Sequence, residues 1–463
     1  MGSIYMYQID FNHPVSVYFM GIGGISMSGL AEVLLSRGFK ISGSDRLKSR
    51  LTESLEEKGA VIYYGQRSEN ITPDIDLVVY TAAISKDNPE WIAMEELNLP
   101  HLSRAELLGE IMRNYALPVA VAGTHGKTTT TSMVSEILLA ADTDPTLSIG
   151  GILKSIDGNI RVGHSEYFVT EACEYTNSFL SFYPKISIIL NVEEDHMDFF
   201  KDLADIRNSF HRFAMLLPQD GTLIINGEIE DYTGITEGIS CPYITYGFTN
   251  DCTYYATDIT YNELGYPTFV LHAKGYGDIA LSLSVPGQHN VSNAMAAMAF
   301  ADCVGIERTT AAMALQNFGG TERRFEYKGS VAGITVIDDY AHHPTEIEAT
   351  LNAARNYNKK VWCIFQPHTY TRTKAFLPEF AKALSLADHV VLADIYAARE
   401  KNTIGIHSTD LLALIEKEGI PCHYFPSFDE IENFLLENCT QGDLLITMGA
   451  GDIVKVGERL LGK

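Results

Sequence analysis

The stretch that decides the fold of this chain is residues 117–131, which read Leu-Pro-Val-Ala-Val-Ala-Gly-Thr-His-Gly-Lys-Thr-Thr-Thr-Thr. A short apolar strand leads into a loop, and a helix-compatible run follows as far as Ala140. The loop glycines let backbone N–H groups turn inward, and the helix N-terminus adds partial positive charge. Lys127 can reach the β- and γ-phosphates, and the Thr128 hydroxyl can ligate Mg²⁺. The stretch therefore predicts a nucleoside triphosphate site, against the simpler alternative of a plain strand–helix turn.

Length and composition are those of a soluble globular protein. The 463 residues suffice for about three domains of ~150 residues. The net charge of −25 argues against a nucleic acid or an anionic membrane as partner. We find no signal peptide, no apolar run long enough to span a bilayer, and no metal-binding spacing among the seven cysteines. We therefore expect a cytoplasmic protein.

Upstream of this loop, a second glycine-rich turn follows another apolar strand. The strand at 15–20 runs into Gly21-Ile22-Gly23-Gly24, and the next strand ends at Ser44-Asp45. This is the order of a Rossmann-type nucleotide unit, although Ser26 stands where the third glycine belongs. The turn favours a diphosphate-bearing ligand over NAD, and a tight turn without a ligand is the alternative.

Alternating strand and helix signals continue along the chain and predict an α/β fold of three domains. We expect a Rossmann-like domain at 1–116, a central ATPase-type domain at 117–318, and a second Rossmann-like domain at 319–463. Residues 242–285 alternate apolar and polar side chains and predict an antiparallel sheet added to the central domain. No internal repeat is visible.

Acidic residues follow two strands of the central domain. Glu171 ends the strand near 167–170, and residues 191–198 (Asn-Val-Glu-Glu-Asp-His-Met-Asp) follow the apolar strand near 186–190. Because parallel strands end at one edge of a sheet, these acids should converge on the phosphate loop. The pattern predicts a phosphoryl-transfer site with two cations, and a solvated acidic turn is the alternative.

Polar clusters also follow strands of the third domain. Arg323-Arg324 lies just past the domain boundary and can clamp phosphates, or else bridge domains by salt bridges. Residues 338–344 (Asp-Asp-Tyr-Ala-His-His-Pro) and 366–373 (Gln-Pro-His-Thr-Tyr-Thr-Arg-Thr) each follow a predicted strand. Because the adjacent histidines His342 and His343 point apart, we expect substrate binding here rather than a metal. Arg372 suits a carboxylate.

Taken together, these motifs resemble those of the Mur ligase family of bacterial cell-wall synthesis, and the resemblance runs from end to end of the chain. The short phosphate loop and the Asp-Tyr-x-His-His-Pro run are its most specific parts. The matching positions are Gly21 to Gly24, Ser28-Gly29, Ser42 to Asp45, Gly123 to Thr129, Glu171, Asn191, Asp195 to Asp198, Gly287, His289-Asn290, Arg323 to Phe325, Asp338 to Tyr340, His342 to Pro344, Phe365 to His368 and Thr371 to Thr373.

The resemblance implies that the first domain binds a UDP-sugar, the second binds ATP, and the third helps to bind ATP and the incoming amino acid. For the UDP-sugar it implies Gly21, Ile22, Gly23, Gly24, Ser44, Asp45, His125 and Glu174. For ATP it implies Gly123, Thr124, His125, Gly126, Lys127, Thr128, Thr129, Asn290 and Arg324. For the amino acid it implies Tyr340, His342 and Arg372. For Mg²⁺ it implies Thr128, Glu171 and His196. As catalytic residues it implies Lys127, His196 and His342.

Three positions depart from the family pattern: Cys173, Thr176 and Thr369 replace two acids and an arginine. Sister ligases carry a carbamylated lysine downstream of the Asp-His-Met-Asp motif, whereas residues 208–212 here contain none. His211 in this region is a candidate to support the metal in its place.

The activity implied is that of an ATP-dependent ligase that joins L-alanine to the lactyl carboxylate of UDP-N-acetylmuramate through an acyl phosphate, with ATP and two Mg²⁺. His196 or His342 would take the ammonium proton. The alternative within the family is a recycling ligase that attaches a tripeptide to the same UDP-sugar. Alternatives from other classes are an NAD-dependent dehydrogenase and a P-loop regulatory protein, but neither explains all the motifs. We expect a monomer or a weak homodimer.

Overall fold

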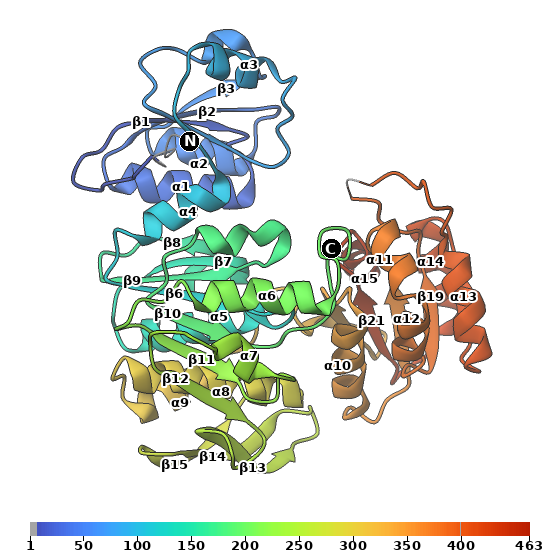
Figure 1. Ribbon diagram of the computed structural model, residues 1–463. Coiled ribbons are helices and arrows are strands. Elements are labelled where there is room, and N and C mark those ends of the chain that lie inside the picture. The colour runs from blue at the N-terminus through green and yellow to red at the C-terminus, as the bar shows by residue number, and fades with distance from the viewer. Residues whose placement is uncertain (1–6, 399) are drawn as a thin grey trace.

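The computed structural model describes residues 7–398 and 400–463 and contains three sheets, one in each third of the chain (Figure 1). The predicted α/β class with three sheet-bearing domains is confirmed. The boundaries 1–116, 117–318 and 319–463 stay a prediction. Among the described residues, no helix is both long and apolar enough to cross a membrane.

The first sheet has five parallel strands in the order β3-β2-β1-β4-β5. Its strands are β1 (Ser16–Met20), β2 (Lys40–Asp45), β3 (Val61–Tyr64), β4 (Leu77–Tyr80) and β5 (His101–Ser103). The helices are α1 (Ile25–Ser36), α2 (Arg50–Glu57), α3 (Pro89–Glu96) and α4 (Arg104–Met112), with the 3₁₀ turn η1 (Ser68–Asn70). Strand β1 is central and its apolar residues are buried, as its sequence predicts.

The central sheet has ten strands in the order β15-β14-β13-β12-β11-β10-β6-β9-β7-β8. They are β6 (Leu117–Ala122), β7 (Thr146–Leu153), β8 (Gly158–Arg161), β9 (Tyr167–Ala172), β10 (Ile186–Ile189), β11 (Thr222–Asn226), β12 (Tyr243–Gly247), β13 (Tyr254–Tyr261), β14 (Pro267–Ala273) and β15 (Gly277–Ser282). The antiparallel prediction for 242–285 holds for β13, β14 and β15 but is wrong for β12. Strand β12 is parallel to β11 because α7 lies between them and returns the chain to the same end of the sheet. It also pairs in parallel with the start of β13, through its last two residues, Tyr246 and Gly247.

The helices of the central domain are α5 (Lys127–Ala140), α6 (Leu203–Ala214), α7 (Tyr232–Thr236), α8 (Gln288–Cys303) and α9 (Arg308–Asn317), with the 3₁₀ turns η2 (Lys154–Ile156) and η3 (Tyr175–Ser181). Helices α5 and α8 pack together against the sheet, and most of their residues are buried. Helix α8 begins at Gln288, directly after Pro286 and Gly287, which follow the last strand of the sheet.

The third sheet has six strands in the order β16-β17-β21-β18-β19-β20. They are β16 (Glu326–Val331), β17 (Ile334–Asp339), β18 (Val361–Phe365), β19 (His389–Leu392), β20 (Cys422–Tyr424) and β21 (Leu444–Met448). Only the edge strand β16 is antiparallel. The helices are α10 (Pro344–Arg355), α11 (Tyr370–Ala375), α12 (Leu377–Leu384), α13 (Ser408–Lys417), α14 (Phe428–Asn438) and α15 (Val454–Leu460).

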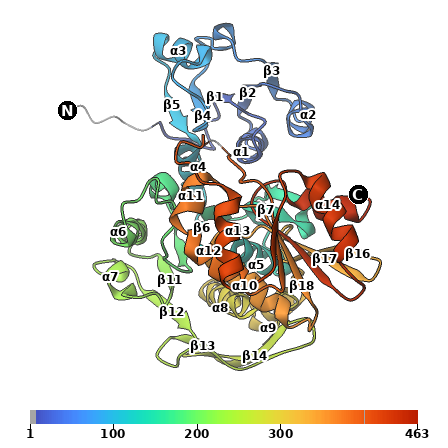
Figure 2. The ribbon, with the colours of Figure 1, turned by 90° about the vertical axis from the view of Figure 1, so that its right-hand side faces the viewer.

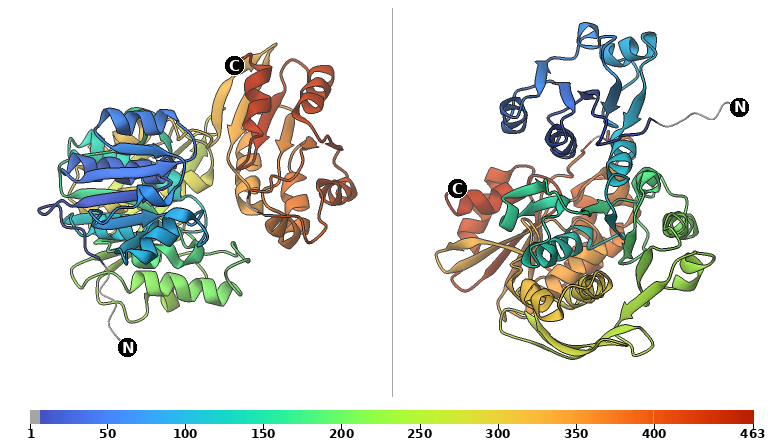
Figure 3. Two further views of the ribbon diagram at one scale, coloured as in Figure 1. Left: turned by 90° about the horizontal axis from the view of Figure 1, so that it is seen from above. Right: turned by 90° about the vertical axis from the view of Figure 1, so that its left-hand side faces the viewer.

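The two domain junctions differ in chemistry. Helix α4 lies between the first and central sheets, and its apolar residues share one buried cluster with both (Figures 1 and 3). The C-terminal domain has buried clusters of its own and lies beside the central domain (Figures 1 and 2). Its contacts with the central domain include ion pairs and hydrogen bonds that surround the site described next.

Candidate active site

Three strand ends meet at the phosphate loop. Strand β6, which carries the loop, lies between β9 and β10, and Ala122 pairs in register with both Ala172 and Ile189. The residues after these strands therefore emerge at one edge, as the sequence predicts. Asn191 fastens the loop, because its amide oxygen accepts a hydrogen bond from the backbone N of His125 at 2.7 Å.

The loop has the backbone that a phosphate cradle requires. Gly123 and Gly126 adopt φ values of 150° and 81°, which side chains with a Cβ rarely tolerate. The ammonium of Lys127 lies 3.1 Å from a carboxylate oxygen of Glu174. Burial alone would lower the pKa of Lys127, but Glu174 raises it above its ordinary value, so the side chain stays charged. The loop thus holds a fixed cation beside its own N–H groups.

A cavity of about 370 Å³ opens in front of the loop. Its walls include the loop residues 124–128, Glu171, Asp195, His196, Arg324 and His342. Central-domain and C-terminal-domain residues therefore share one cavity, although Asp195 and His342 are far apart in sequence.

Oxygen ligands suited to Mg²⁺ surround this cavity. Thr128 and Glu171 line it, and Glu171 also accepts a hydrogen bond from the backbone N of Gly150 at 2.6 Å. Glu174 Oε1 is buried, has no hydrogen-bond partner among the described residues, and lies 3.8 Å from His196 Nε2. A buried acceptor without a donor is a position that a hard cation can satisfy. The predicted ligands Thr128 and Glu171 thus offer the oxygen atoms that Mg²⁺ prefers, and Glu174, which was predicted for the sugar, offers a further one.

The backbone of His196 is strained, with φ 53°, and its ring stacks on Tyr175 at 4.5 Å between centroids. His211, the other candidate for metal support, lies on α6 with Nδ1 3.1 Å from the carbonyl oxygen of Ile235. It lines none of the three cavities described here. Burial raises the pKa of Cys173 to about 11, so this residue is a thiol rather than an anion.

A second cavity of about 290 Å³ adjoins the first on the side of α8. Asn290, Asn293 and Arg324 line it, and Asn293 Nδ2 donates to Asn290 Oδ1 at 3.1 Å. Sequence reasoning singled out Asn290 but missed Asn293, which its spacing of three residues on a helix places on the same face. Asp339 also lines this cavity, where burial raises its pKa to about 6.

The two arginines after the domain boundary have different surroundings. Arg323 Nε donates to Asp338 at 2.8 Å and Nη2 donates to the carbonyl of Gly449 at 2.7 Å, so this side chain is fixed within its own domain. Arg324 lines both the first and the second cavity. Both guanidinium groups lie over the ring of Tyr340, at 4.9 and 5.2 Å from its centroid.

A third cavity of about 320 Å³ adjoins the first on its other side. It is lined by residues that include Asp198, Tyr340, His342, His368 and Arg372. The predicted carboxylate clamp Arg372 pairs with Asp195, and its Nε and Nη2 lie 3.2 and 3.1 Å from one oxygen.

Sequence reasoning also missed Glu400 in this third cavity. Glu400 accepts hydrogen bonds from the backbone N atoms of Tyr370 and Thr371 and holds the segment that begins at Thr369, whose φ is 64°. The sequence position of Glu400 could have indicated this role. Glu400 lies in the loop after β19, and β19 is next to β18 in the sheet.

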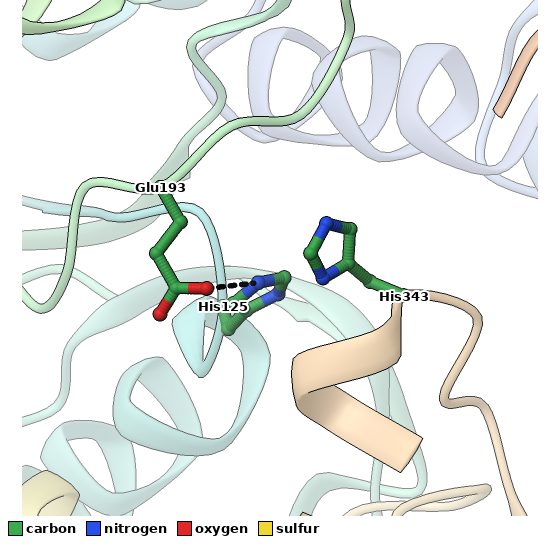
Figure 4. Close-up of side chains that lie close together, drawn as sticks. All are labelled: His125, Glu193 and His343. Carbon is green, nitrogen blue, oxygen red and sulfur yellow. Dashed lines mark ion pairs between the residues drawn. The ribbon is translucent and has the colours of Figure 1, made fainter. Parts of the chain in front are cut away.

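His125, Glu193 and His343 lie close together at the junction of the two domains (Figure 4). His343 Nε2 donates to the carbonyl of Glu194 at 3.0 Å, and its Nδ1 accepts from the backbone N of Thr345 at 3.3 Å. Both ring nitrogens of His343 are thereby used. We therefore interpret the group as a hydrogen-bonded contact between domains and not as a metal centre.

The glycine-rich turn of the first domain is held from within. Asp45 accepts a hydrogen bond from the backbone N of Gly23 at 2.8 Å. Ser44 is fully buried and donates to the buried carboxylate of Glu90 at 2.7 Å. Glu174 lies at the phosphate loop, in contact with Lys127. The predicted UDP-sugar contacts of these residues and of residues 21–24 stay predictions.

Comparison with known proteins gives one family over nearly the whole chain. Family profiles described as the Mur ligase family catalytic domain, the Mur ligase middle domain and the Mur ligase glutamate ligase domain match residues 16–116, 121–301 and 323–451. Curated relatives named UDP-N-acetylmuramate–L-alanine ligase include one from Agathobacter rectalis, 59% identical over 99% of this chain and 100% of the relative. Another, from Lachnoclostridium phytofermentans, is 53% identical with the same coverage of each chain.

Comparison with solved structures leads to the same family. The UDP-N-acetylmuramate–alanine ligase of Thermotoga maritima superposes with a TM-score of 0.79 at 30% identity, over 96% of this chain and 98% of that one. A murein peptide ligase from Psychrobacter arcticus gives 0.69 at 26% identity, over 97% and 98%. The chain therefore belongs to the Mur ligase family.

Proposed function

We propose that this chain is an ATP-dependent ligase that joins L-alanine to the lactyl carboxylate of UDP-N-acetylmuramate and forms ADP and phosphate. The observation that carries the proposal is the series of three adjoining cavities. His125, Arg324 and Glu346 line both the second and the first cavity, and Asp195, His196, Tyr340 and His342 line both the first and the third. This order suits a nucleoside, then its phosphates, then an amino acid.

The relatives support the choice of amino acid. Those at 50–59% identity that span nearly the whole chain carry the name UDP-N-acetylmuramate–L-alanine ligase. The murein peptide ligase from Psychrobacter arcticus is only 26% identical. A single amino acid is therefore the better-supported acceptor than a tripeptide.

In the first chemical step, a lactyl carboxylate oxygen attacks the γ-phosphorus of ATP, and the bond to the β–γ bridging oxygen breaks. Lys127 and the N–H groups of the phosphate loop offset the charge that develops on the phosphoryl oxygens. ADP leaves and an acyl phosphate remains. Because the loop is preorganised by Asn191, little reorganisation is needed at this point.

In the second step, the amine of L-alanine attacks the acyl carbon, and the carbon–oxygen bond to phosphate breaks. The ammonium proton must first pass to a base, for which His342 and His196 both line the first and third cavities. Arg372 lines the third cavity and can hold the amino-acid carboxylate.

Mg²⁺ would be held by Thr128, Glu171 and His196 and would supply further charge stabilisation at the phosphoryl group. We expect two ions, because acidic residues follow both strands that flank β6. We also propose that the protein is a cytoplasmic monomer or weak homodimer.

The test is phosphate release from ATP with UDP-N-acetylmuramate and each amino acid in turn, with the tripeptide L-alanyl-γ-D-glutamyl-meso-diaminopimelate alongside. We expect release with UDP-N-acetylmuramate and L-alanine together and not with either alone. Preference for the tripeptide would establish the recycling activity instead. Release without any acceptor, or none under all conditions, would refute the ligase assignment.

A further inference from the structure

One carboxylate joins the phosphate loop to the amino-acid side of the site. Glu346 lies in the first turn of α10, in the C-terminal domain, and its side chain is only 14% exposed. Its Oε1 lies 3.1 Å from Nδ1 of His125, in the phosphate loop of the central domain. Its Oε2 accepts a hydrogen bond from the backbone N of His342 at 3.0 Å and lies 3.3 Å from that ring's Nδ1.

The proton on His342 can be placed from its neighbours. Nδ1 lies 3.0 Å from the carbonyl oxygen of Tyr340, which can only accept a hydrogen bond. Nδ1 therefore carries the hydrogen, and in the neutral ring Nε2 carries the lone pair. Burial lowers the pKa of His342 to about 4, so the ring is neutral near pH 7, and Glu346 opposes that lowering.

His196 is less suited to take the ammonium proton. Its Nε2 lies 3.6 Å from Asp195 and 3.8 Å from Glu174, so carboxylates already flank that atom. His342 has its carboxylate behind the ring, at Nδ1, and it borders both the phosphate cavity and the amino-acid cavity. Arg372 and Asp195 are the other charged groups that face His342, and the His368 ring lies 5.8 Å from it.

His125, the other histidine that Glu346 contacts, is charged rather than neutral. Burial disfavours the imidazolium, but Glu193 and Glu346 raise the pKa of His125 to about 9. Its two ring nitrogens lie 3.5 Å from Glu193 and 3.1 Å from Glu346, so the ring is fixed from both sides. The His343 ring lies 4.6 Å away. The orientation of the His125 ring therefore depends in part on a carboxylate from the other domain.

We propose that Glu346 is a positioning residue that orients His125 and His342 at once, and that His342 Nε2 takes the ammonium proton of the amino acid. The inference rests on the proposed function. The first proton passes from the ammonium nitrogen to Nε2, and the freed electron pair forms the C–N bond. The bond to phosphate breaks with its electron pair, and the departing phosphate takes the second proton from the nitrogen. Because one carboxylate serves both histidines, the phosphoryl-transfer side and the amine side are assembled only when the two domains meet.

The experiment separates the two halves of the reaction in single turnovers. ADP formation with UDP-N-acetylmuramate alone reports the first half, and product formation after L-alanine is added reports the second. Glu346→Gln keeps the size of the side chain but loses its charge. We expect it to slow both halves about 10- to 100-fold, the range for carboxylates that orient a histidine from behind. The matched control is Glu348→Gln, an exposed glutamate on the same helix, which should leave both rates unchanged.

A cycle with His342→Asn distinguishes positioning from a merely structural role. His342→Asn should slow only the second half. In that background, Glu346→Gln should slow the second half by less than about threefold, because the group it orients is gone. Glu346→Asp keeps the charge but is too short to reach both histidines, and it should slow both halves as well. The KM for UDP-N-acetylmuramate should stay at its wild-type value in all variants, and thermal unfolding checks that each variant is folded at the assay temperature.

Equal rates for Glu346→Gln and Glu348→Gln would overturn the inference. So would a second-half loss in the double variant equal to the product of the two single losses. If the wild-type protein shows no L-alanine-dependent phosphate release, the proposed function itself fails, and that outcome is separate from these two.

Discussion

For single residues, we expect the charge on Lys127 to matter most for phosphoryl transfer. Glu174 keeps this buried ammonium protonated, and the loop carbonyl of Thr124 lies 3.1 Å from it. Lys127→Ala should lower the rate of phosphate release by about 10²–10³, the usual loss when one electrostatic stabiliser is removed. The KM for the UDP-sugar should hardly change. Lys201→Ala, an exposed lysine of the same domain, is the control, and equal activity of the two variants would refute this role.

A separate prediction concerns Glu171 and the binding of Mg²⁺. It lines the first cavity with Thr128 at the end of β9, where an ionised oxygen ligand suits Mg²⁺. Glu171→Gln should raise the Mg²⁺ concentration needed for half-maximal activity, measured by titration at saturating ATP. Glu166→Gln, an exposed glutamate just before the same strand, should not. A change confined to the KM for UDP-sugar would show that Glu171 serves the sugar instead.

Arg372 carries the prediction for the amino acid. Its planar group already holds Asp195 through two nitrogens, and lysine cannot reproduce that fork. A charge-assisted hydrogen bond contributes about 1.5–3 kcal/mol, so Arg372→Lys should raise the KM for L-alanine roughly 10- to 150-fold. Acyl-phosphate formation should survive. Arg355→Lys, exposed at the end of α10, is the control, and equal loss of acyl-phosphate formation would move Arg372 to the phosphoryl-transfer site.

At the scale of elements, helix α4 fastens the first domain to the central one through close backbone contact. A Cβ on Gly109 would collide with the carbonyl oxygen of Ser181 in η3. Because backbone cannot yield as a flexible side chain does, Gly109→Ala should destabilise the protein by about 1–3 kcal/mol, measured by denaturant unfolding. Gly319→Ala has open space around its Cβ and is the matched control. Equal stability of the two variants would show that the junction adapts.

The loops after β17 and β18 show how the end of a strand places functional side chains. Asp339 and Phe365 both pair with Met448 of β21, so the residues that follow β17 and β18 emerge at the same edge of the sheet, on either side of β21. This register brings His342 and His368 to the same cavity.

For the whole molecule, we expect one part of the contact between the central and C-terminal domains, the His125–Glu346 pair, to be strongest while His125 is protonated. Its folded pKa of about 9 lies above the ordinary value of 6.5. The folded state therefore gains stability from this group below about pH 6.5, and that contribution is lost as the pH rises through about 9. Glu193, Glu346 and the His343 ring surround His125 from the loop after β10 and from the start of α10.

We expect the difference in unfolding free energy between wild type and His125→Gln to be largest below pH 6.5 and to vanish above about pH 9. Denaturant unfolding across this range measures it. His164→Gln, an exposed histidine of the central domain, serves as the control and should give no such window between pH 6.5 and 9. A difference that is constant with pH would show that His125 is neutral in the folded protein.

The phosphate loop, an α/β class with three domains and most strands near the site can be predicted from the amino-acid sequence alone. These features depend on local apolar periodicity, glycine turns and strand ends, which neighbouring residues specify. Sequence reasoning missed the parallel pairing of β12, because the direction of a strand depends on how the intervening chain crosses the sheet.

The pairs of side chains that face one another across domains are visible only once the chain is folded. Glu346 reaches His125 over 221 residues, and Arg372 reaches Asp195 over 177. No local pattern encodes such pairs, since they depend on how separately folded domains pack. The same reason explains why the sequence left the base open between His196 and His342, and why it assigned Arg372 to a substrate without its partner Asp195. The residue types at the site could be predicted from local sequence patterns, whereas their partners depend on how the domains pack.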